Sequence, residues 1–312
     1  MLTEIEGLHH VTSIASSSLQ NNAFFTNVLG LRRIKATVNF DFPEVYHLYY
    51  GDEIGSAGSV MTYFPFENRK RRTKGAGEVG VTVFSVPKDA LGFWTDRLAN
   101  FAVSAPKMST SFGQARLEFT GPDGDEFALV ECEDNRIPWT TTTIPKDVAI
   151  RGFHSAEMRL NEVAATAELL NFMGYEKFDT QDEIQRFILP NGGPANIIDL
   201  RTNPTADAAV QGAGSVHHIA FSVKDRAAQA EVRRALLDTG YAVTGVRDRN
   251  YFYAIYFKSP QGILFEVATH EPGFDFDEDR AHLGSALKLP PQHEHLRKDL
   301  ATKLTPLDGV SF

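Results

Sequence analysis

Two histidine doublets occupy nearly the same local sequence in two distant parts of the chain. His9 and His10 lie in the segment LHHVT, His217 and His218 lie in VHHIA, and Glu266 follows the second doublet inside the apolar run ILFEVA. Two imidazoles and one carboxylate can hold a divalent metal on one face and leave the opposite coordination positions open. These residue types therefore predict a metalloenzyme.

The histidines belong to a pattern that the chain repeats four times. The segments HHVTSIAS, GVTVFSVP, FHSAEMRL and HHIAFSVK each indicate a strand that leads into an amphipathic helix and then into short β-rich stretches joined by turns. When these strands are superposed, the aligned positions are His10, Val81, His154 and His218, at near-equal intervals. Each repeat is therefore predicted to be a βαβββ module.

A single module of this kind has a curved sheet with unpaired edges and cannot bury its own face. We therefore expect an α+β fold in which four βαβββ modules pair into two cupped mixed β-sheets. Modules 1 and 2 are predicted in residues 1–132 and modules 3 and 4 in residues 151–271. The stretch 133–150, rich in Pro and Thr, is predicted to be a linker, and 272–312 a C-terminal tail of loop and short helix.

The last strands of the modules indicate which repeat can supply a carboxylate. Aligned through the glycine of the preceding turn, they place Thr62, Ala128, Ile197 and Glu266 at one position. In this alignment only module 4 carries a carboxylate, so His218 and Glu266 are the firmest predicted ligands.

The third ligand depends on how the modules pair. If modules 1 and 4 share a cup, His10 completes the site, whereas His154 does so if modules 3 and 4 pair. Module 1 repeats the whole doublet of module 4, and module 3 does not. The sequence therefore favours His10 and a metal cup shared by modules 1 and 4.

Further candidates flank these ligands on the same strands. Because strand side chains alternate, His9 and His217 are expected to point away from the site, unless a bulge or a strand end turns them toward it. Thr12 has the same parity as His10 and can line the cup.

The strand that precedes Glu266 supplies two groups for proton transfer or charge stabilisation. Tyr256 is expected beside Glu266 on the adjacent strand, where its phenol can donate to a bound substrate. Arg249, near the head of that strand, can hold an anionic oxygen.

Three other polar segments are expected to be structural. The basic run Arg69–Lys74 is predicted to be a solvated loop, with contact to an anion or a partner as the alternative. The segment VYHLYYGD indicates mainly a half-buried strand, with substrate contact as the alternative for His47 and its tyrosines. The tail histidines are expected to be solvent-exposed: His282, His293 and His295.

Composition narrows the classes of partner. The formal net charge of −9 offers no broad positive field, which disfavours nucleic acid. Cys132 is the single cysteine, the chain lacks an apolar run near the roughly 18 residues of a membrane span, and it begins without the basic and apolar regions of a secretion signal. We therefore expect a cytoplasmic protein without nucleic-acid or membrane partners; a homo-oligomer is compatible with the sequence.

The four-module pattern, together with the phrases LHHVT, YHLYYGDE, RGFHS and LFEVATHEPGF, resembles the vicinal oxygen chelate superfamily. More narrowly, the chain from about Leu8 to the LKLPP motif at 287–291 is similar to bacterial dioxygenases that open hydroquinone rings. This resemblance implies an Fe(II) ion, with Mn(II) as the alternative, held by His10, His218 and Glu266. It also implies substrate-side roles for five residues: His9, Thr12, His217, Arg249 and Tyr256.

The resemblance implies insertion of O2 into a small hydroquinone-type aromatic ring, and it leaves rivals of other kinds. An extradiol catechol dioxygenase would hold its metal in modules 3 and 4 and use an additional acid-base histidine, where this chain has only Asn203 nearby. A glyoxalase-type isomerase would need a further carboxylate at Thr62, Ala128 or Ile197. A non-catalytic protein that binds aromatic compounds or confers resistance, or a purely structural repeat protein, would not need the metal ligands.

Overall fold

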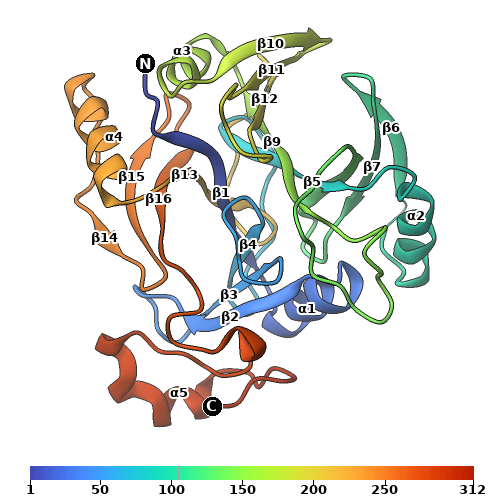
Figure 1. Ribbon diagram of the computed structural model, residues 1–312, viewed down its shortest axis with the longest axis vertical. Helices are drawn as coiled ribbons and strands as arrows, with labels where there is room; N and C mark the ends of the chain where they lie inside the picture. The colour runs from blue at the N-terminus through green and yellow to red at the C-terminus, as the bar shows by residue number, and fades with distance from the viewer. Residues whose placement is uncertain (105) are drawn as a thin grey trace.

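The structure is a computed structural model that describes residues 1–104 and 106–312. Two mixed sheets of eight strands each dominate these residues, and short helices flank them, with the helical segment 18–28 close to both sheets (Figure 1). The strand order is β14-β15-β16-β13-β1-β4-β3-β2 in the first sheet and β10-β11-β12-β9-β5-β8-β7-β6 in the second. The predicted α+β class with two cupped mixed sheets is therefore confirmed.

Each sheet contains two βαβββ modules. The elements of module 1 are β1 (Ile5–Ala15), α1 (Ser18–Ala23) with its π-helical extension η1 (Phe24–Val28), β2 (Arg32–Val38), β3 (Tyr46–Gly51) and β4 (Val60–Pro65). Those of module 2 are β5 (Glu78–Val86), α2 (Leu91–Asn100), β6 (Lys107–Ser111), β7 (Gln114–Thr120) and β8 (Glu126–Glu131).

Modules 3 and 4 repeat the same order of elements. Module 3 contains β9 (Gly152–Leu160), α3 (Ala164–Phe172), β10 (Glu176–Gln181), β11 (Ile184–Ile188) and β12 (Ile197–Thr202). Module 4 contains β13 (Val216–Val223), α4 (Arg226–Asp238), β14 (Arg247–Asp248), β15 (Phe252–Lys258) and β16 (Leu264–Pro272). The tail contributes η2 (Arg280–His282), η3 (Pro291–Leu296) and α5 (Arg297–Lys303).

The first strands of the modules form the seams of the two sheets. Strand β1 pairs antiparallel with β13, so modules 1 and 4 share the first sheet, and β5 pairs antiparallel with β9, so modules 2 and 3 share the second. Within every module the first strand runs parallel to the fourth. Side chains of β1, β13 and β16 therefore lie on neighbouring strands, although they are far apart in the sequence.

Three histidines occupy β-bulges at these seams. The residues on either side of His9 pair with consecutive residues of β13, so His9 has no cross-strand partner. His217 is the extra residue of β13 in the same way, and His154 is the extra residue of β9. A bulge breaks the alternation of side chains along a strand. Simple parity therefore does not decide where these three imidazoles point.

The hydrogen-bond register corrects the alignment of the last strands. In module 4 Ala220, three residues after the bulged His217, pairs with Glu266. In module 3 the equivalent residue is Glu157, three residues after the bulged His154, and it pairs with Asp199. The counterpart of Glu266 is therefore Asp199 and not Ile197, so the inference that only module 4 carries a carboxylate there was wrong. The turn before β12 (189–196) is longer than the turn before β16 (259–263), and this length difference shifted the alignment through the turn glycines.

The same register changes the counterparts of the histidine doublet in module 3. Ser155 corresponds to His218, and His154 corresponds to the bulged His217. The alignment of His154 with His218 was therefore one residue out of step.

Aromatic side chains fill the space between the two sheets. Phe25 stacks on Tyr50 of β3 with ring centroids 4.8 Å apart and also contacts Phe127 of β8 at 6.0 Å. Each such ring contributes roughly 1.5–3 kcal/mol by leaving water. The stretch 133–150 also connects the two sheets through hydrogen bonds, because Arg136 donates to the carbonyl oxygens of Gly58 in module 1 and Phe153 in module 3.

The tail lies along the outer strand of the first sheet, where Figure 1 shows it in red beside β2. Its buried leucines pack on module 1, and Leu287 forms a parallel bridge with Ala36. The ammonium of Lys35 is fully buried, 2.7 Å from Asp277 Oδ1 and 2.5 Å from Glu278 Oε2. Among the described helices, none is long and apolar enough to cross a membrane.

Candidate metal centre

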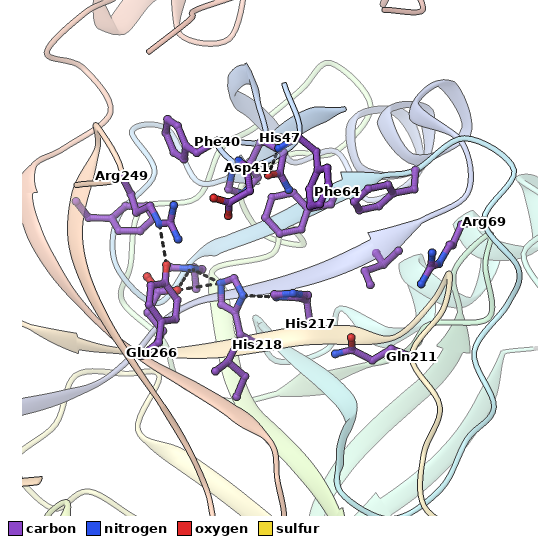
Figure 2. Close-up of a pocket in the computed structure, with 18 residues that line it drawn as sticks. Phe40, Asp41, His47, Phe64, Arg69, Gln211, His217, His218, Arg249 and Glu266 are labelled. Atoms are coloured by element: carbon purple, nitrogen blue, oxygen red, sulfur yellow. Dashed lines mark hydrogen bonds and ion pairs between the residues drawn. The ribbon is translucent and has the colours of Figure 1, made fainter. Parts of the chain in front are cut away.

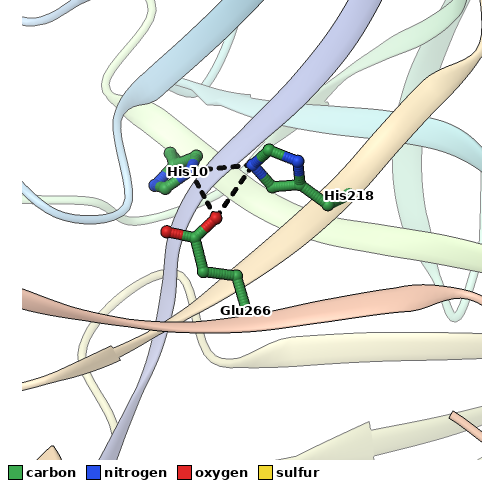
Figure 3. A group of neighbouring side chains, drawn as sticks. All are labelled: His10, His218 and Glu266. Atoms are coloured by element: carbon green, nitrogen blue, oxygen red, sulfur yellow. Dashed lines mark hydrogen bonds and ion pairs between the residues drawn. The ribbon is translucent and has the colours of Figure 1, made fainter. Parts of the chain in front are cut away.

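Three side chains from three neighbouring strands converge in the first sheet. His10 lies on β1, His218 on β13 and Glu266 on β16, and one ligand atom from each lies within 4.8 Å of the others (Figure 3). The Nε2 atoms of the histidines are 3.3 Å apart, and Glu266 Oε2 lies 3.5 Å from His10 Nε2 and 2.9 Å from His218 Nε2.

The local backbone explains this convergence. Ala220 pairs with His10 on one side and with Glu266 on the other, and His218 stands two residues earlier on the same strand. All three side chains therefore project from the same face around one small residue. His154, the alternative third ligand, lies on β9 in the other sheet.

The carboxylate of Glu266 lacks the partners that a buried charge normally has. Its side chain is 0% exposed, and neither of its oxygens accepts a hydrogen bond of good geometry from a described residue. Burial alone would raise its pKa, but the adjacent His10 and His218 outweigh this and hold the pKa of Glu266 well below its usual value. An ionised, buried carboxylate is costly unless it is paired or binds a metal. A divalent cation between the two Nε2 atoms and Oε2 fits this donor set, which suits iron or manganese.

Each convergent histidine is held by the histidine that precedes it. His10 Nδ1 lies 2.9 Å from His9 Nδ1, and His218 Nδ1 lies 2.8 Å from His217 Nδ1. When Nε2 of His10 or His218 is the ligand atom, its Nδ1 carries the proton and donates it to the bulged neighbour. His9 and His217 therefore fix the ring orientation and the tautomer of the two predicted ligands.

Both supporting histidines are neutral near pH 7. Burial, followed by the nearby His218, lowers the pKa of His217 to about 4. Burial, followed by His10, likewise lowers the pKa of His9 well below its usual value. Because Nδ1 of neutral His217 accepts the proton of His218, its Nε2 carries a hydrogen that can be donated elsewhere.

A cavity of about 560 Å³ opens beside the three convergent side chains (Figure 2). His217, Arg249 and Tyr256 line it together with His10, His218 and Glu266. Five phenylalanines provide most of its apolar wall: Phe40, Phe42, Phe64, Phe66 and Phe252. An aromatic ring matches such a wall in shape and polarity.

Arg249 and Tyr256 form a donor pair on the cavity wall. Arg249 Nε donates to the Tyr256 hydroxyl at 3.0 Å, and Tyr256 is the cross-strand partner of Glu266. Burial, and then the charge of Glu266, raise the pKa of Tyr256 well above its usual value, so the phenol stays protonated. Its oxygen accepts from Arg249, and its hydrogen can be donated toward Glu266 or to a ligand in the cavity.

Two of the predicted site residues lie beside the cavity without lining it. His9 is buried behind His10, and the Thr12 hydroxyl is 2.8 Å from that of Thr62. Thr62 occupies in module 1 the position that Glu266 occupies in module 4, and its hydroxyl lies 2.9 Å from His47 Nε2.

Sequence reasoning missed several residues of the cavity wall. His47 was assigned mainly to a half-buried strand, with substrate contact as the alternative; it lines the cavity, and Tyr49 OH lies 2.8 Å from its Nδ1. Residues 39–42 come from the loop between β2 and β3, which carries no motif that would mark it. Arg69, from the basic run, lines the cavity with Gln211 at the side away from Arg249 (Figure 2).

Comparison with known proteins gives relatives that match along the whole chain. The chain is 41% identical over 310 residues to the "Putative ring-cleaving dioxygenase MhqO" of Bacillus subtilis (strain 168), covering 99% of this chain and 98% of that protein. It is 34% identical over 308 residues to the chlorohydroquinone/hydroquinone 1,2-dioxygenase of Sphingobium indicum, covering 95% of each. No family model matches the chain.

Solved structures give the same picture for the fold. A crystal structure of a "putative dioxygenase" from Bacillus subtilis subsp. subtilis str. 168 superposes with a TM-score of 0.95 at 40% identity, covering 99% of both chains. Glyoxalase I from Zea mays matches with a TM-score of 0.63 at 12% identity over 85% of this chain and 92% of its own, which shows a shared fold only. The chain therefore belongs to the vicinal oxygen chelate superfamily, in the group of its ring-cleaving dioxygenases.

Proposed function

We propose that this protein is an Fe(II)-dependent dioxygenase that inserts O2 into a hydroquinone-type aromatic ring and opens it. The observation that carries the proposal is the convergence of His10, His218 and Glu266 beside a cavity walled by phenylalanines. The names of the relatives support ring cleavage as the reaction class and hydroquinones as the substrate class.

His10, His218 and Glu266 would hold the ion. Bound there, Fe(II) would supply Lewis acidity toward a phenolic oxygen and one-electron chemistry toward O2. Mn(II) accepts the same donor set and is the alternative ion. Because the three residues are at most 5% exposed, their charges act in a poorly hydrated site, where electrostatic effects are strong.

The other polar groups of the cavity act as donors toward oxygen atoms of the substrate. Nε2–H of neutral His217 and the phenol of Tyr256 each offer one hydrogen, and the Arg249 guanidinium adds a fixed positive charge. Donors and charges that are in place beforehand stabilise the negative charge that develops on oxygen during ring opening. The phenylalanine wall keeps the ring beside these groups and excludes water from them.

The rival with the metal in modules 3 and 4 lacks support. His154 lies in the other sheet, and the carboxylate of Asp199 accepts two bonds from Arg186. A non-catalytic protein that binds aromatic compounds remains the second candidate, since the same cavity could hold a ring without turnover.

Iron content and oxygen uptake test the proposal. Protein purified without oxygen and supplied with Fe(II) is expected to retain stoichiometric iron and to consume O2 on addition of hydroquinone. His218→Ala is expected to lose iron and oxygen uptake together. His154→Ala, which removes a buried bulge histidine from the other sheet, is the matched control and is expected to keep both.

Two results would contradict the proposal. Iron retention by His218→Ala would show that the ion binds elsewhere. Full iron loading without oxygen uptake, with either hydroquinone or catechol as substrate, would favour the non-catalytic alternative.

A further inference from the structure

The second sheet encloses a cavity of its own, of about 400 Å³, in the place that corresponds to the metal centre. Val81 and Glu157 line it, and they take the register positions of His10 and Ala220. By the same register Ser155 replaces His218, and Asp199 replaces Glu266. The N,N,O donor set is therefore absent from this cup.

Arginines neutralise the carboxylates that would otherwise attract a cation. Arg186 donates to both oxygens of Asp199 at 2.8 Å each and is covered by the ring of Phe112, 3.9 Å from its guanidinium carbon. Arg201 binds Glu157 through two hydrogen bonds in the same manner. A guanidinium thus stands beside the carboxylate that corresponds to the predicted metal ligand.

Arg159 completes this set of paired cations. It donates to Glu126 at 2.7 Å and lies 3.4 Å from Glu78, and both of those carboxylates also contact Arg72. Arg186, Arg201 and Arg159 therefore each donate to carboxylates of this chain.

Arg116 is the exception among the described residues. It lies on β7, lines the cavity and is 5% exposed, yet its guanidinium donates no hydrogen bond to any described residue. Its nearest carboxylate is Glu118, whose Oε1 is 3.4 Å from Arg116 Nε and already accepts from Ser109 Oγ at 2.9 Å.

The neighbour His154 adds no second positive charge beside Arg116. Burial, followed by the charges of Arg186 and Arg116, lowers the pKa of His154 to about 3, so it is neutral near pH 7. Buried guanidinium N–H groups without an acceptor are costly, and a bound anion that accepts hydrogen bonds from them removes that cost.

We infer that the second cup binds a small organic monocarboxylate, whose carboxylate pairs with Arg116 and whose apolar body rests on the cavity wall. A guanidinium fork matches the two oxygens of a carboxylate. Val81, Phe119 and Phe127 line the same cavity and provide an apolar surface for the rest of the molecule.

The charges around the cavity select against more highly charged anions. Glu118, Glu126 and Glu157 all line it, so a dianion such as phosphate meets like charges on several sides. Exposed Lys107 at the same cavity adds one positive charge to that of Arg116. A ligand with a single carboxylate on an apolar body matches this small excess of positive charge and avoids the repulsion that a dianion meets. Its binding does not depend on the metal centre.

Titration calorimetry with benzoate tests the inference. Benzoate is expected to bind the wild-type protein, whereas neutral benzamide and inorganic phosphate are not. Arg116→Gln is expected to weaken benzoate binding at least about tenfold, the loss for a charge-assisted pair. Arg249→Gln is the matched control, because it removes a guanidinium from the other cavity and leaves Arg116 in place. Equal benzoate binding by Arg116→Gln, or loss of binding in Arg249→Gln, would overturn the inference.

Thermal unfolding gives a second measurement, in which Arg116→Gln is expected to lose no stability although it loses benzoate binding. Without ligand, Arg116→Gln is expected to unfold at the same temperature as the wild type or higher, because a buried guanidinium without a hydrogen-bond acceptor has been removed. Benzoate is expected to raise the midpoint of the wild type only. Arg116→Lys keeps the charge without the guanidinium fork, and its benzoate-induced rise in midpoint is expected to lie between those of the wild type and Arg116→Gln. This variant keeps the test available if the glutamine variant does not fold. A benzoate shift of equal size in all three proteins would contradict the assignment.

Discussion

His217 and His218 are adjacent, but their ring nitrogens serve different ends. Nε2 of His218 points at Glu266, while Nδ1 of His217 accepts the remaining proton of His218. His217 is therefore left with a single free donor, Nε2–H, on the wall of the cavity. At this scale the site combines two convergent imidazoles with separate neutral donors.

Replacing His217 tests its role as a donor. His217→Ala is expected to lower kcat for hydroquinone by about 10²–10³-fold, the loss typical of a donor to a developing oxyanion. Because the ligand atoms remain, iron content is expected to stay within a factor of a few. His9→Ala, which removes the equivalent support from His10 without touching the cavity, is the comparison. Complete iron loss in His217→Ala would show that its main role is to hold His218.

Tyr256→Phe tests the second donor. The variant keeps the ring but loses the hydroxyl that accepts from Arg249, and kcat is expected to fall about 10–100-fold with iron retained. Tyr253→Phe alters a tyrosine of the same strand that does not line the cavity, and it is expected to leave kcat unchanged. Equal rates for Tyr256→Phe and the wild type would remove Tyr256 from the reaction.

At the scale of elements, Ala220 sets the spacing of the centre. It is fully buried, with His10 and Glu266 as its partners on the two neighbouring strands. Because its methyl group lies on the face from which the ligand atoms project, a larger side chain would separate them. This position explains why a small residue follows the doublet at that point of β13.

Ala220→Val is expected to weaken Fe(II) binding more than it weakens the fold. Overpacking of a core costs about 1–3 kcal/mol in the free energy of unfolding. Ala156→Val makes the same change at a buried position of β9 in the second sheet and controls for that cost. Iron affinity, measured by competition with a chelator, is expected to fall in Ala220→Val only. An equal loss in both variants would point to general destabilisation.

Repetition made the elements predictable from the sequence. The βαβββ order, the two-sheet class and the approach of His10, His218 and Glu266 all follow from four similar segments with a doublet in the first and the last. The third module was misaligned because its last turn carries additional residues, so Asp199 escaped notice. The bulges at His9 and His217 arise from pairing between distant strands, and one strand alone carries no sign of them.

The cavity wall was less predictable than the ligand set. Phe40, Phe42, Arg69 and Gln211 lie in loops or irregular segments whose course depends on the whole fold. The basic run that contains Arg69 was expected to be solvated; Arg72, from the same run, is instead buried in ion pairs with Glu78 and Glu126. The sequence pattern alone cannot distinguish a solvated arginine from one held in ion pairs, because the outcome depends on which residues, distant in the sequence, lie beside the side chain.

At the scale of the whole molecule, one buried acid couples the contact between modules 1 and 2 to pH. Burial raises the pKa of Asp125, before β8, to about 6, although Tyr63 of β4 donates a hydrogen bond to it at 2.7 Å. Because the folded pKa lies above the ordinary value of 3.8 for an aspartate, this group stabilises the fold below about pH 4. The contribution is lost as the pH rises through 6.

Asp125→Asn is expected to remove this pH dependence. Relative to the wild type, the free energy of unfolding of the variant is expected to rise between pH 4 and pH 8, by up to about 3 kcal/mol. Urea unfolding at several pH values measures the difference. Asp96→Asn, at an exposed position of α2, is the control and is expected to follow the wild type at every pH. Parallel curves for Asp125→Asn and the wild type would contradict the shifted pKa.

The strands of the second sheet lie in the sequence between the two modules that form the first sheet, and this order has a consequence for synthesis on the ribosome. The second sheet is built from one continuous part of the sequence, from β5 to β12, and can assemble while module 4 is still being translated. The first sheet pairs β1 with β13, which pairs in turn with β16, so a nascent chain that ends before residue 218 has only His10 of the three convergent donors. The three donors can therefore converge only after β16 has been translated, and an interrupted translation product lacks the complete donor set.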